Sequence, residues 1–211
     1  MRNIYEFEKD GLRRIQFSDD NWKWNLIDEN ESLVFKENYY YISRLEKDNL
    51  RTIQLDNNSN WNLINSKENI ICKENYKYIG SLESDGLRKI TTDNNEHNLI
   101  DSKGNLILKQ SYKNIYGIDS DYLRIIQLSE KEFNLIDSEG NLVFKQNFFD
   151  IGDLEKDGLR RVLLSENQFN LIDSKGKLFF NSNHYNISKF KNNKRIIKNI
   201  EILNYSDYKN I

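Results

Sequence analysis

Apolar residues occur along this chain in short alternating runs, separated by clusters of Asp, Asn, Ser, Lys and Gly. One representative stretch reads Phe133-Asn134-Leu135-Ile136, then a polar turn, then Leu142-Val143-Phe144. Short runs rich in Ile and aromatic residues between polar turns favour β-strands over helices. The chain also contains no alanine, the strongest helix former. The pattern therefore predicts an all-β protein.

This stretch recurs at a nearly constant step. Its aromatic first position returns after 37 residues once and after 36 residues three times, and a Leu-Arg pair keeps the same step. A fixed period of this length is the signature of a tandem-repeat architecture. The aromatic positions are Trp24, Trp61, His97, Phe133 and Phe169, and the arginines of the Leu-Arg motif are Arg13, Arg51, Arg88, Arg124 and Arg160.

Each copy is expected to hold about three antiparallel strands. The first strand contains the Leu-Arg pair, the second begins at the aromatic position, and the third follows a turn that has Gly fourth in the later copies. In the two earlier copies Asn30 and Asn69 are expected to take the positive φ of this turn. The predicted Leu-Arg strands are Leu12–Phe17, Leu50–Leu55, Leu87–Thr92, Leu123–Leu128 and Leu159–Leu164. The predicted third strands are Leu33–Lys36, Ile70–Lys73, Leu106–Lys109, Leu142–Lys145 and Leu178–Asn181.

Residues 1–186 are predicted to form an array of five such copies, open and curved or superhelical. A closed five-bladed propeller is the alternative, since 36 residues can supply one blade. Residues 187–211 are predicted to form a partial repeat and a C-terminal cap, in which Arg195-Ile196-Ile197 stands for the Leu-Arg strand. Asn199–Ile211 is expected to be a cap or a final edge strand, with a short helix or a disordered tail as alternatives.

Composition limits the partners and the compartment. The 31 basic and 33 acidic residues give a net charge of −2, so no global attraction to nucleic acid or an anionic membrane is expected. Cys72 is the single cysteine, which excludes an intramolecular disulfide and a thiolate metal cluster. The first residues contain no apolar signal segment and no stretch is long enough to span a bilayer, which predicts a cytoplasmic location and no membrane partner.

The order and spacing of these motifs resemble the WG-repeat (KWG-repeat) family over about residues 4–187. This chain has Asn where the family has Gly after the Trp, Lys-Glu or a similar pair in place of Pro-Pro, and Arg in place of the Ala of Gly-Leu-Ala. The resemblance implies a repeat architecture and an extended interaction module without a known activity. The matching residues of the first copy are Trp24, Leu26-Ile27-Asp28, Leu33-Val34, Tyr39, Ile42, Leu45, Leu50 and Ile53.

The arginine column is the feature of the sequence that most clearly suggests a specific chemical role. One interpretation is structural: each guanidinium pairs with an acid of a neighbouring copy, for which Asp28, Asp101, Asp137 and Asp173 are available. The alternative is an anion-binding ladder that grips a phosphate backbone, helped by the local +4 charge of residues 181–211. The aromatic columns are expected in the core, with Trp22, Tyr40, Tyr41 and Phe149 as exposed anchors.

No catalytic, cofactor or metal site is predicted, because the chain has no nucleophile elbow, phosphate loop or metal-ligand cluster. An enzyme is not expected. One acidic row, which includes Glu8 and Asp10, is expected to be a solvated edge. A second acidic loop row varies between copies, as recognition loops do. Its residues, with a nearby Trp, are the predicted partner-binding set: Asp19, Asp20, Trp22, Asp56, Asp93, Glu96, Glu130, Glu132 and Glu166.

The sequence thus predicts a non-enzymatic protein-binding module that acts by occupancy, with a basic protein as the favoured partner and the oligomeric state left open. Its most concrete form is an inhibitor or immunity protein that blocks a toxin or nuclease, as in bacterial competition or phage–host conflict. The alternative is an RNA or single-strand-binding surface built from the arginine column and the basic tail.

Overall fold

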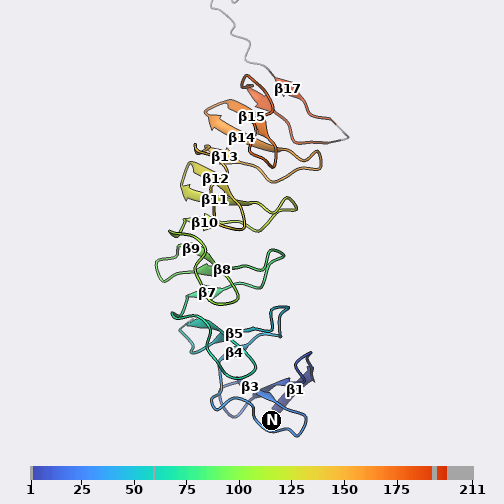
Figure 1. Cartoon of the computed structure of the whole chain (residues 1–211), viewed down its shortest axis with the longest axis vertical. Coiled ribbons are helices and arrows are strands. Elements are labelled where there is room, and N and C mark those ends of the chain that lie inside the picture. The colour runs from blue at the N-terminus through green and yellow to red at the C-terminus, as the bar shows by residue number, and fades with distance from the viewer. Residues whose placement is uncertain (1, 59, 192–193, 199–211) are drawn as a thin grey trace, which may run out of the picture. The chain divides into compact units, whose positions relative to one another are not determined.

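The computed structural model of the protein describes residues 2–58, 60–191 and 194–198. Within them every regular element is a β-strand and none is a helix (Figure 1), which confirms the all-β tandem array. They form two compact units that divide between Ile115 and Tyr116, called unit 1 and unit 2 below. The choice between an open array and a closed propeller stays a prediction.

Unit 1 holds the first ten strands. These are β1 (Arg2–Phe7), β2 (Arg13–Phe17), β3 (Lys23–Ile27), β4 (Tyr41–Ile42), β5 (Arg51–Gln54), β6 (Trp61–Ile64), β7 (Tyr78–Ile79), β8 (Arg88–Thr91), β9 (His97–Ile100) and β10 (Asn114–Ile115). Unit 2 holds β11 (Arg124–Ser129), β12 (Glu132–Ile136), β13 (Asp150–Ile151), β14 (Arg160–Ser165), β15 (Gln168–Ile172), β16 (Asn186–Ile187) and β17 (Ile197–Lys198).

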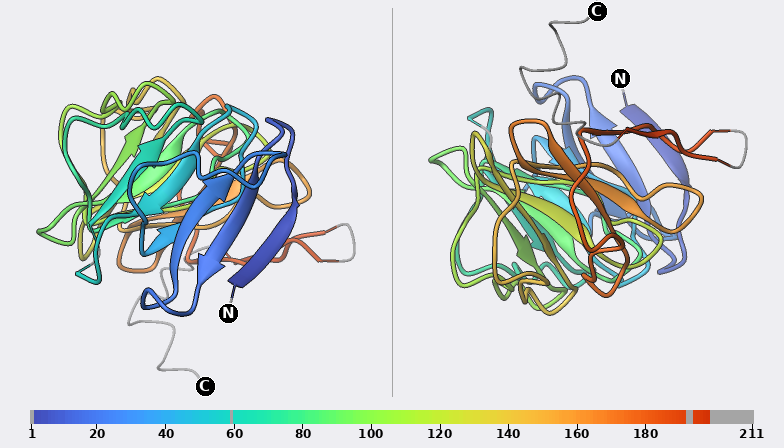
Figure 2. Two further views of the ribbon diagram at one scale, coloured as in Figure 1. Left: turned by 90° about the horizontal axis from the view of Figure 1, so that it is seen from below. Right: turned by 90° about the horizontal axis from the view of Figure 1, so that it is seen from above.

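Each copy forms a small antiparallel sheet in which the Leu-Arg strand is central. In the second copy β5 pairs with β4 on one side and with β6 on the other, so that Tyr41, Gln54 and Trp61 are in register across the sheet. The blue strands in the left view of Figure 2 show the same arrangement for β1, β2 and β3. The predicted Leu-Arg and aromatic strands are therefore confirmed to within one or two residues.

The predicted third strand of each copy is wrong. Ile70–Lys73 and its counterparts form single bridges, such as Ile64 with Ile70, and otherwise lie outside the strands. The third strand of the sheet is instead the short segment that opens each copy, for example β4. The cause is an asparagine that takes over the hydrogen bonds of the third segment.

That asparagine follows the aromatic residue in every copy. In the second copy Asn62 is 1% exposed, and its Oδ1 accepts from the backbone N–H of Leu63 and of Cys72. Its Nδ2 donates to the carbonyls of Cys72 and Glu74. A buried backbone group needs a partner, and one amide side chain here satisfies several. The asparagine therefore holds the third segment against the sheet.

The turn before the third segment has the predicted form. In the third copy Gly104 has φ +77°, its N–H donates to the Asp101 carbonyl, and Asp101 Oδ1 accepts from the N–H of Lys103 and of Asn105. The expectation for the two earlier copies is wrong: Glu31 and Glu68, at φ 59° and 63°, occupy the left-handed position in place of the asparagines. The geometry of the turn requires its fourth residue to adopt the left-handed backbone conformation, whichever side chain it carries.

Consecutive copies bury their aliphatic side chains against each other within each unit. In unit 1 Leu26 and Phe35 of the first copy share a cluster with Ile42 and Ile53 of the second. Unit 2 builds its cluster in the same way from its own copies. The column of Tyr39, Tyr76, Tyr112 and Phe148 is buried, as predicted.

The predicted partial repeat stays a prediction, but two of its features are visible. β16 pairs with β17, and Arg195 takes the place of the column arginine, since its Nε and Nη2 lie 2.6 and 2.7 Å from the two carboxylate oxygens of Asp157. The predicted cap or edge strand, Asn199–Ile211, lies outside the described residues.

Candidate functional site

Three arginines of the column, Arg51, Arg88 and Arg160, are buried and paired with acids of the preceding copy. In unit 1 Arg88 has no exposed surface, and its Nη1 and Nη2 lie 2.6 and 2.9 Å from the carboxylate oxygens of Asp48. Glu46 adds a second acid at 3.6 Å. Arg51 binds Asp10 and Glu8 in the same way. The forked guanidinium matches a carboxylate in two parallel bonds, which makes each pair directional.

Unit 2 repeats this geometry. Arg160 is fully buried, and its guanidinium binds both oxygens of Asp121 and one oxygen of Asp119. Arg124 is also fully buried. Arg13, at the start of the column, differs: its side chain is 19% exposed and 3.8 Å from Glu31, and its guanidinium lies 4.4 Å from the centre of the Phe7 ring.

The acids that pair with the column are not the ones expected. The Oδ1 atoms of Asp28 and Asp137 accept backbone N–H groups inside their own turns. The acids that do pair come from the row expected to be a solvated edge, represented by Glu8 and Asp10. The sequence signal was available, because this row keeps the period of the arginine column as faithfully as the turns do.

The ion pairs change the titration of these acids. Burial alone would raise the pKa of Asp10, but hydrogen bonds from Arg51 and Ser66 and the charge of Arg51 bring it below its ordinary value. The pKa of Asp121 is likewise lowered against its burial, through Arg160. For Asp157 the hydrogen bond from Arg195 is the largest cause of a lowered pKa. Asp10, Asp121 and Asp157 therefore stay ionised at neutral pH.

The predicted partner-binding loop residues divide into exposed and internally bonded groups. Asp20 accepts a hydrogen bond from Asn38 at 2.9 Å, and Asp56 accepts from the Asn58 N–H and from Asn60 Nδ2 at 2.8 and 2.6 Å. Trp22 is 56% exposed. The exposed acids of the set are Asp19, Asp93, Glu96, Glu130, Glu132 and Glu166.

A row of aromatic rings follows one side of unit 1. It consists of Tyr5, Trp24, Tyr41, Trp61 and Tyr78, called the aromatic row, and successive ring centres lie 5.2, 6.1, 5.6 and 5.8 Å apart. The three tyrosines are 37–49% exposed. The two tryptophans are half-buried rather than fully in the core, and each ring lies between two exposed tyrosines of the row.

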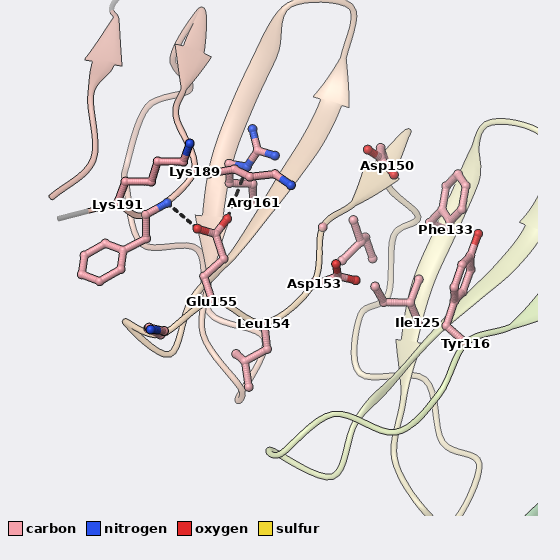
Figure 3. A pocket seen from close by; sticks show the side chains of 14 residues that line it. Tyr116, Ile125, Phe133, Asp150, Asp153, Leu154, Glu155, Arg161, Lys189 and Lys191 are labelled. Atoms are coloured by element: carbon pink, nitrogen blue, oxygen red, sulfur yellow. Dashed lines mark hydrogen bonds and ion pairs between the residues drawn. The ribbon is translucent and has the colours of Figure 1, made fainter. Parts of the chain in front are cut away.

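Unit 2 contains a pocket of about 490 Å³. One side is formed by Tyr116, Ile125 and Phe133, with Asp150 and Asp153 next to them (Figure 3). The other side carries Lys189 and Lys191, both exposed, and the ion pair of Arg161 with Glu155 at 3.6 Å. Exposed Lys156 also lines the pocket. Sequence reasoning did not find this pocket.

Some kinds of site are not found in the part of the chain that the structure describes. Residues 2–58, 60–191 and 194–198 hold no group of three or more His, Cys, Asp or Glu side chains able to bind a metal ion. Burial raises the pKa of the Cys72 thiol, which disfavours the reactive thiolate. The same described residues contain no helix that is long and apolar enough to cross a membrane.

Comparisons with known proteins give distant structural likeness only. No family model and no curated protein matches the sequence. A streptogramin B lyase aligns at 12% identity and a TM-score of 0.35, over 93% of this chain and 75% of the lyase. Virginiamycin B lyase from Staphylococcus aureus aligns at 13% and 0.36, over 83% and 68%. Apo AztD from Citrobacter koseri aligns at 14% and 0.38, over 84% and 58%. Likeness at this level supports no transfer of activity.

Proposed function

We propose that this protein is a non-enzymatic binding module of the WG-repeat type that recognises another protein and acts by occupying its surface. The observation that carries the proposal is the aromatic row of unit 1. Tyr and Trp are enriched at protein interfaces because each offers a large apolar area with a polar tip. Five such rings in contact form a surface patch of the kind that marks an interaction site.

The internal bonding of the repeated polar residues supports the same proposal. The guanidinium groups of Arg51, Arg88 and Arg160 form ion pairs with acids inside the protein. They are therefore not available to bind a phosphate backbone. An ordered row of amphipathic rings, held by a scaffold of paired residues, is pre-organised and loses little conformational freedom when a partner binds. Rigid aromatic anchors of this kind are typical hot spots of protein interfaces.

The most concrete role is that of an inhibitor or immunity protein that blocks a basic toxin or nuclease. Residues 1–180 carry a net charge of −6, which includes the exposed loop acids Asp19, Asp93 and Glu96 of unit 1. Long-range charge attraction of this kind raises the rate of association with a basic partner. A binder that covers an active site needs no catalytic groups of its own.

Site-specific crosslinking in the source cells tests the proposal. A photoreactive phenylalanine replaces Tyr41 or Tyr78 in the aromatic row, and Leu106, 54% exposed and outside the row, serves as the control. We expect one defined protein adduct from the two row positions and none from Leu106. The captured protein is then assayed alone, with the wild-type chain and with the Tyr41→Ser/Tyr78→Ser variant. We expect inhibition by the wild-type chain only.

Two results would overturn the proposal. Equal adducts from Leu106 and from the row would mean that the row is not a recognition surface. Adducts with RNA in place of protein, weakened by added salt, would favour the nucleic-acid alternative.

A further inference from the structure

Three copies hold a cation at one equivalent position, immediately after the column arginine. Arg14 Nη1 donates to the carbonyl of Ile42 at 3.2 Å, and Lys89 Nζ donates to that of Ile115 at 3.1 Å. In unit 2 Arg161 Nη1 donates to the carbonyl of Ile187, also at 3.1 Å. In each case the acceptor belongs to the opening strand of the next copy. These copies therefore mark a place in the fold where a cation binds.

The fourth copy lacks this cation. The residue after its column arginine is Ile125, which cannot donate a hydrogen bond, and the equivalent acceptor is the carbonyl of Ile151. Ile125 and Ile151 both line the pocket of unit 2. The pocket therefore opens at the place that a guanidinium or ammonium group occupies in three other copies.

The aromatic surroundings of the missing cation are retained. The Arg14 guanidinium lies 5.1 Å from the centre of the Tyr5 ring and 5.4 Å from that of the Trp24 ring. Both distances are typical of cation–π contacts. Tyr5 corresponds to Tyr116 in the fourth copy, and Trp24 corresponds to Phe133. Both residues line the pocket, and Figure 3 shows them on the same side of it.

The pocket of unit 2 also carries two carboxylates at positions where other copies have uncharged or basic residues. Asp150 stands where the second and third copies have Tyr41 and Tyr78, and Asp153 stands where the second copy has Arg44. Both carboxylates are exposed and line the pocket, and neither has an ion-pair partner among residues 2–58, 60–191 and 194–198. Rings and carboxylates together attract a cation.

We propose that this pocket binds the guanidinium group of an arginine side chain presented by the partner protein. A planar guanidinium stacks on aromatic rings and forks onto carboxylates better than an ammonium group does. Arg161 lies 3.6 Å from Glu155, which Arg195 also approaches to 3.5 Å, and Lys189 and Lys191 lie on the other side of the pocket (Figure 3). The volume of about 490 Å³ is within the range of small-ligand sites. The inference deepens the proposed function, since it names one chemical feature of the partner.

Titration of the full chain with two small probes tests the pocket directly. N-acetyl-arginine amide carries the guanidinium, and N-acetyl-citrulline amide has the same shape without the charge. Chemical shifts of Tyr116 and Phe133 are followed by NMR. We expect saturable binding of the arginine probe and binding of the citrulline probe weaker by about tenfold or more, the order expected for a charge-assisted pair.

Two variants identify the residues responsible. The Asp150→Asn/Asp153→Asn variant removes both negative charges at exposed positions. We expect it to lower the affinity for the arginine probe about tenfold or more. Glu139→Gln, an exposed acid of unit 2 outside the pocket, is the matched control and leaves binding unchanged. Ile125→Arg restores the internal cation of the other copies, and we expect it to abolish binding of the probe.

Equal binding of the two probes, or wild-type binding by the Asp150→Asn/Asp153→Asn variant, would overturn the proposal. The latter variant also decides the question if Ile125→Arg does not fold. Failure here is distinguishable from failure of the proposed function, because the crosslinks from Tyr41 and Tyr78 test unit 1 alone.

Discussion

Arg88 has no exposed surface, and Asp48 and Glu46 lie within 3.6 Å of its guanidinium. Placing two ions in a low-dielectric interior costs desolvation energy, which a well-aligned pair largely offsets. Removal of one residue of the ion pair leaves the buried charge of the other without a partner. The start of the column offers a natural comparison, because Arg13 keeps partial exposure and a distant acid.

We expect Arg88→Met to lower the free energy of unfolding by about 3–5 kcal/mol, the usual cost of breaking a buried pair. Arg13→Met is the matched control and should cost about 1 kcal/mol or less, since exposed pairs contribute little. Urea unfolding followed by circular dichroism measures both. Equal costs would contradict the assignment of Arg88 to a structural pair.

The lowered pKa values of Asp10, Asp121 and Asp157 make stability depend on pH in a definite direction. Each carboxyl binds its proton more weakly in the folded chain than at its ordinary pKa of 3.8. Their contribution to stability is therefore complete above about pH 4 and is lost as the pH falls through the lowered values. We expect the free energy of unfolding to fall steeply below pH 4, and less steeply in Asp157→Asn. An identical slope in the variant would contradict this account.

At the scale of the element, the pattern of short Ile- and aromatic-rich runs between polar turns predicted the Leu-Arg and aromatic strands. It failed for the third segment, represented by Ile70–Lys73. That segment is as apolar as a strand, but Asn62 satisfies its backbone groups in place of a ladder. Side-chain capture of the backbone leaves no periodic signal in the segment itself.

The turn of the third copy shows how an element contacts its neighbour. A Cβ added to Gly104 would lie 2.9 Å from Cys72 Cα and from the Ile71 carbonyl oxygen, which are backbone atoms of the second copy. Gly86 also has positive φ, but a Cβ there would meet nothing within 4 Å. Gly86 is therefore a control for backbone strain without the contact.

We expect Gly86→Ala to destabilise unit 1 by about 1 kcal/mol, the cost of a left-handed conformation. Gly104→Ala adds the backbone clash and should cost about 2–4 kcal/mol, in the range of overpacked sites. Thermal and urea unfolding of the two variants measure the difference. Equal effects would mean that the turn and the second copy separate easily.

At the scale of the whole molecule, the interactions described within each unit join copies that follow one another in the chain. Arg88 binds acids of the preceding copy in unit 1, and Arg160 does so in unit 2. In repeat proteins stability is close to a sum of such nearest-neighbour terms, and local unfolding is the expected response to damage.

Hydrogen exchange of Arg160→Met tests this locality. We expect faster amide exchange in β14 and β15, next to the lost ion pair, and unchanged exchange in β2 and β3 of unit 1. A uniform loss of protection across all strands would instead indicate one cooperative unit.

The sequence by itself determined the period, the all-β class, the two main strands of each copy and the buried tyrosine column, because these depend on spacing along the chain. It also indicated that the arginines are structural. Only the tertiary structure decided which acids they meet, since Arg88 and Asp48 are 40 residues apart. The exposed aromatic row and the pocket lined by Ile125 could also be found only in the tertiary structure, because both form where side chains of successive copies meet. Periodicity describes what the copies share, whereas a binding site depends on where one copy differs from its neighbours in space.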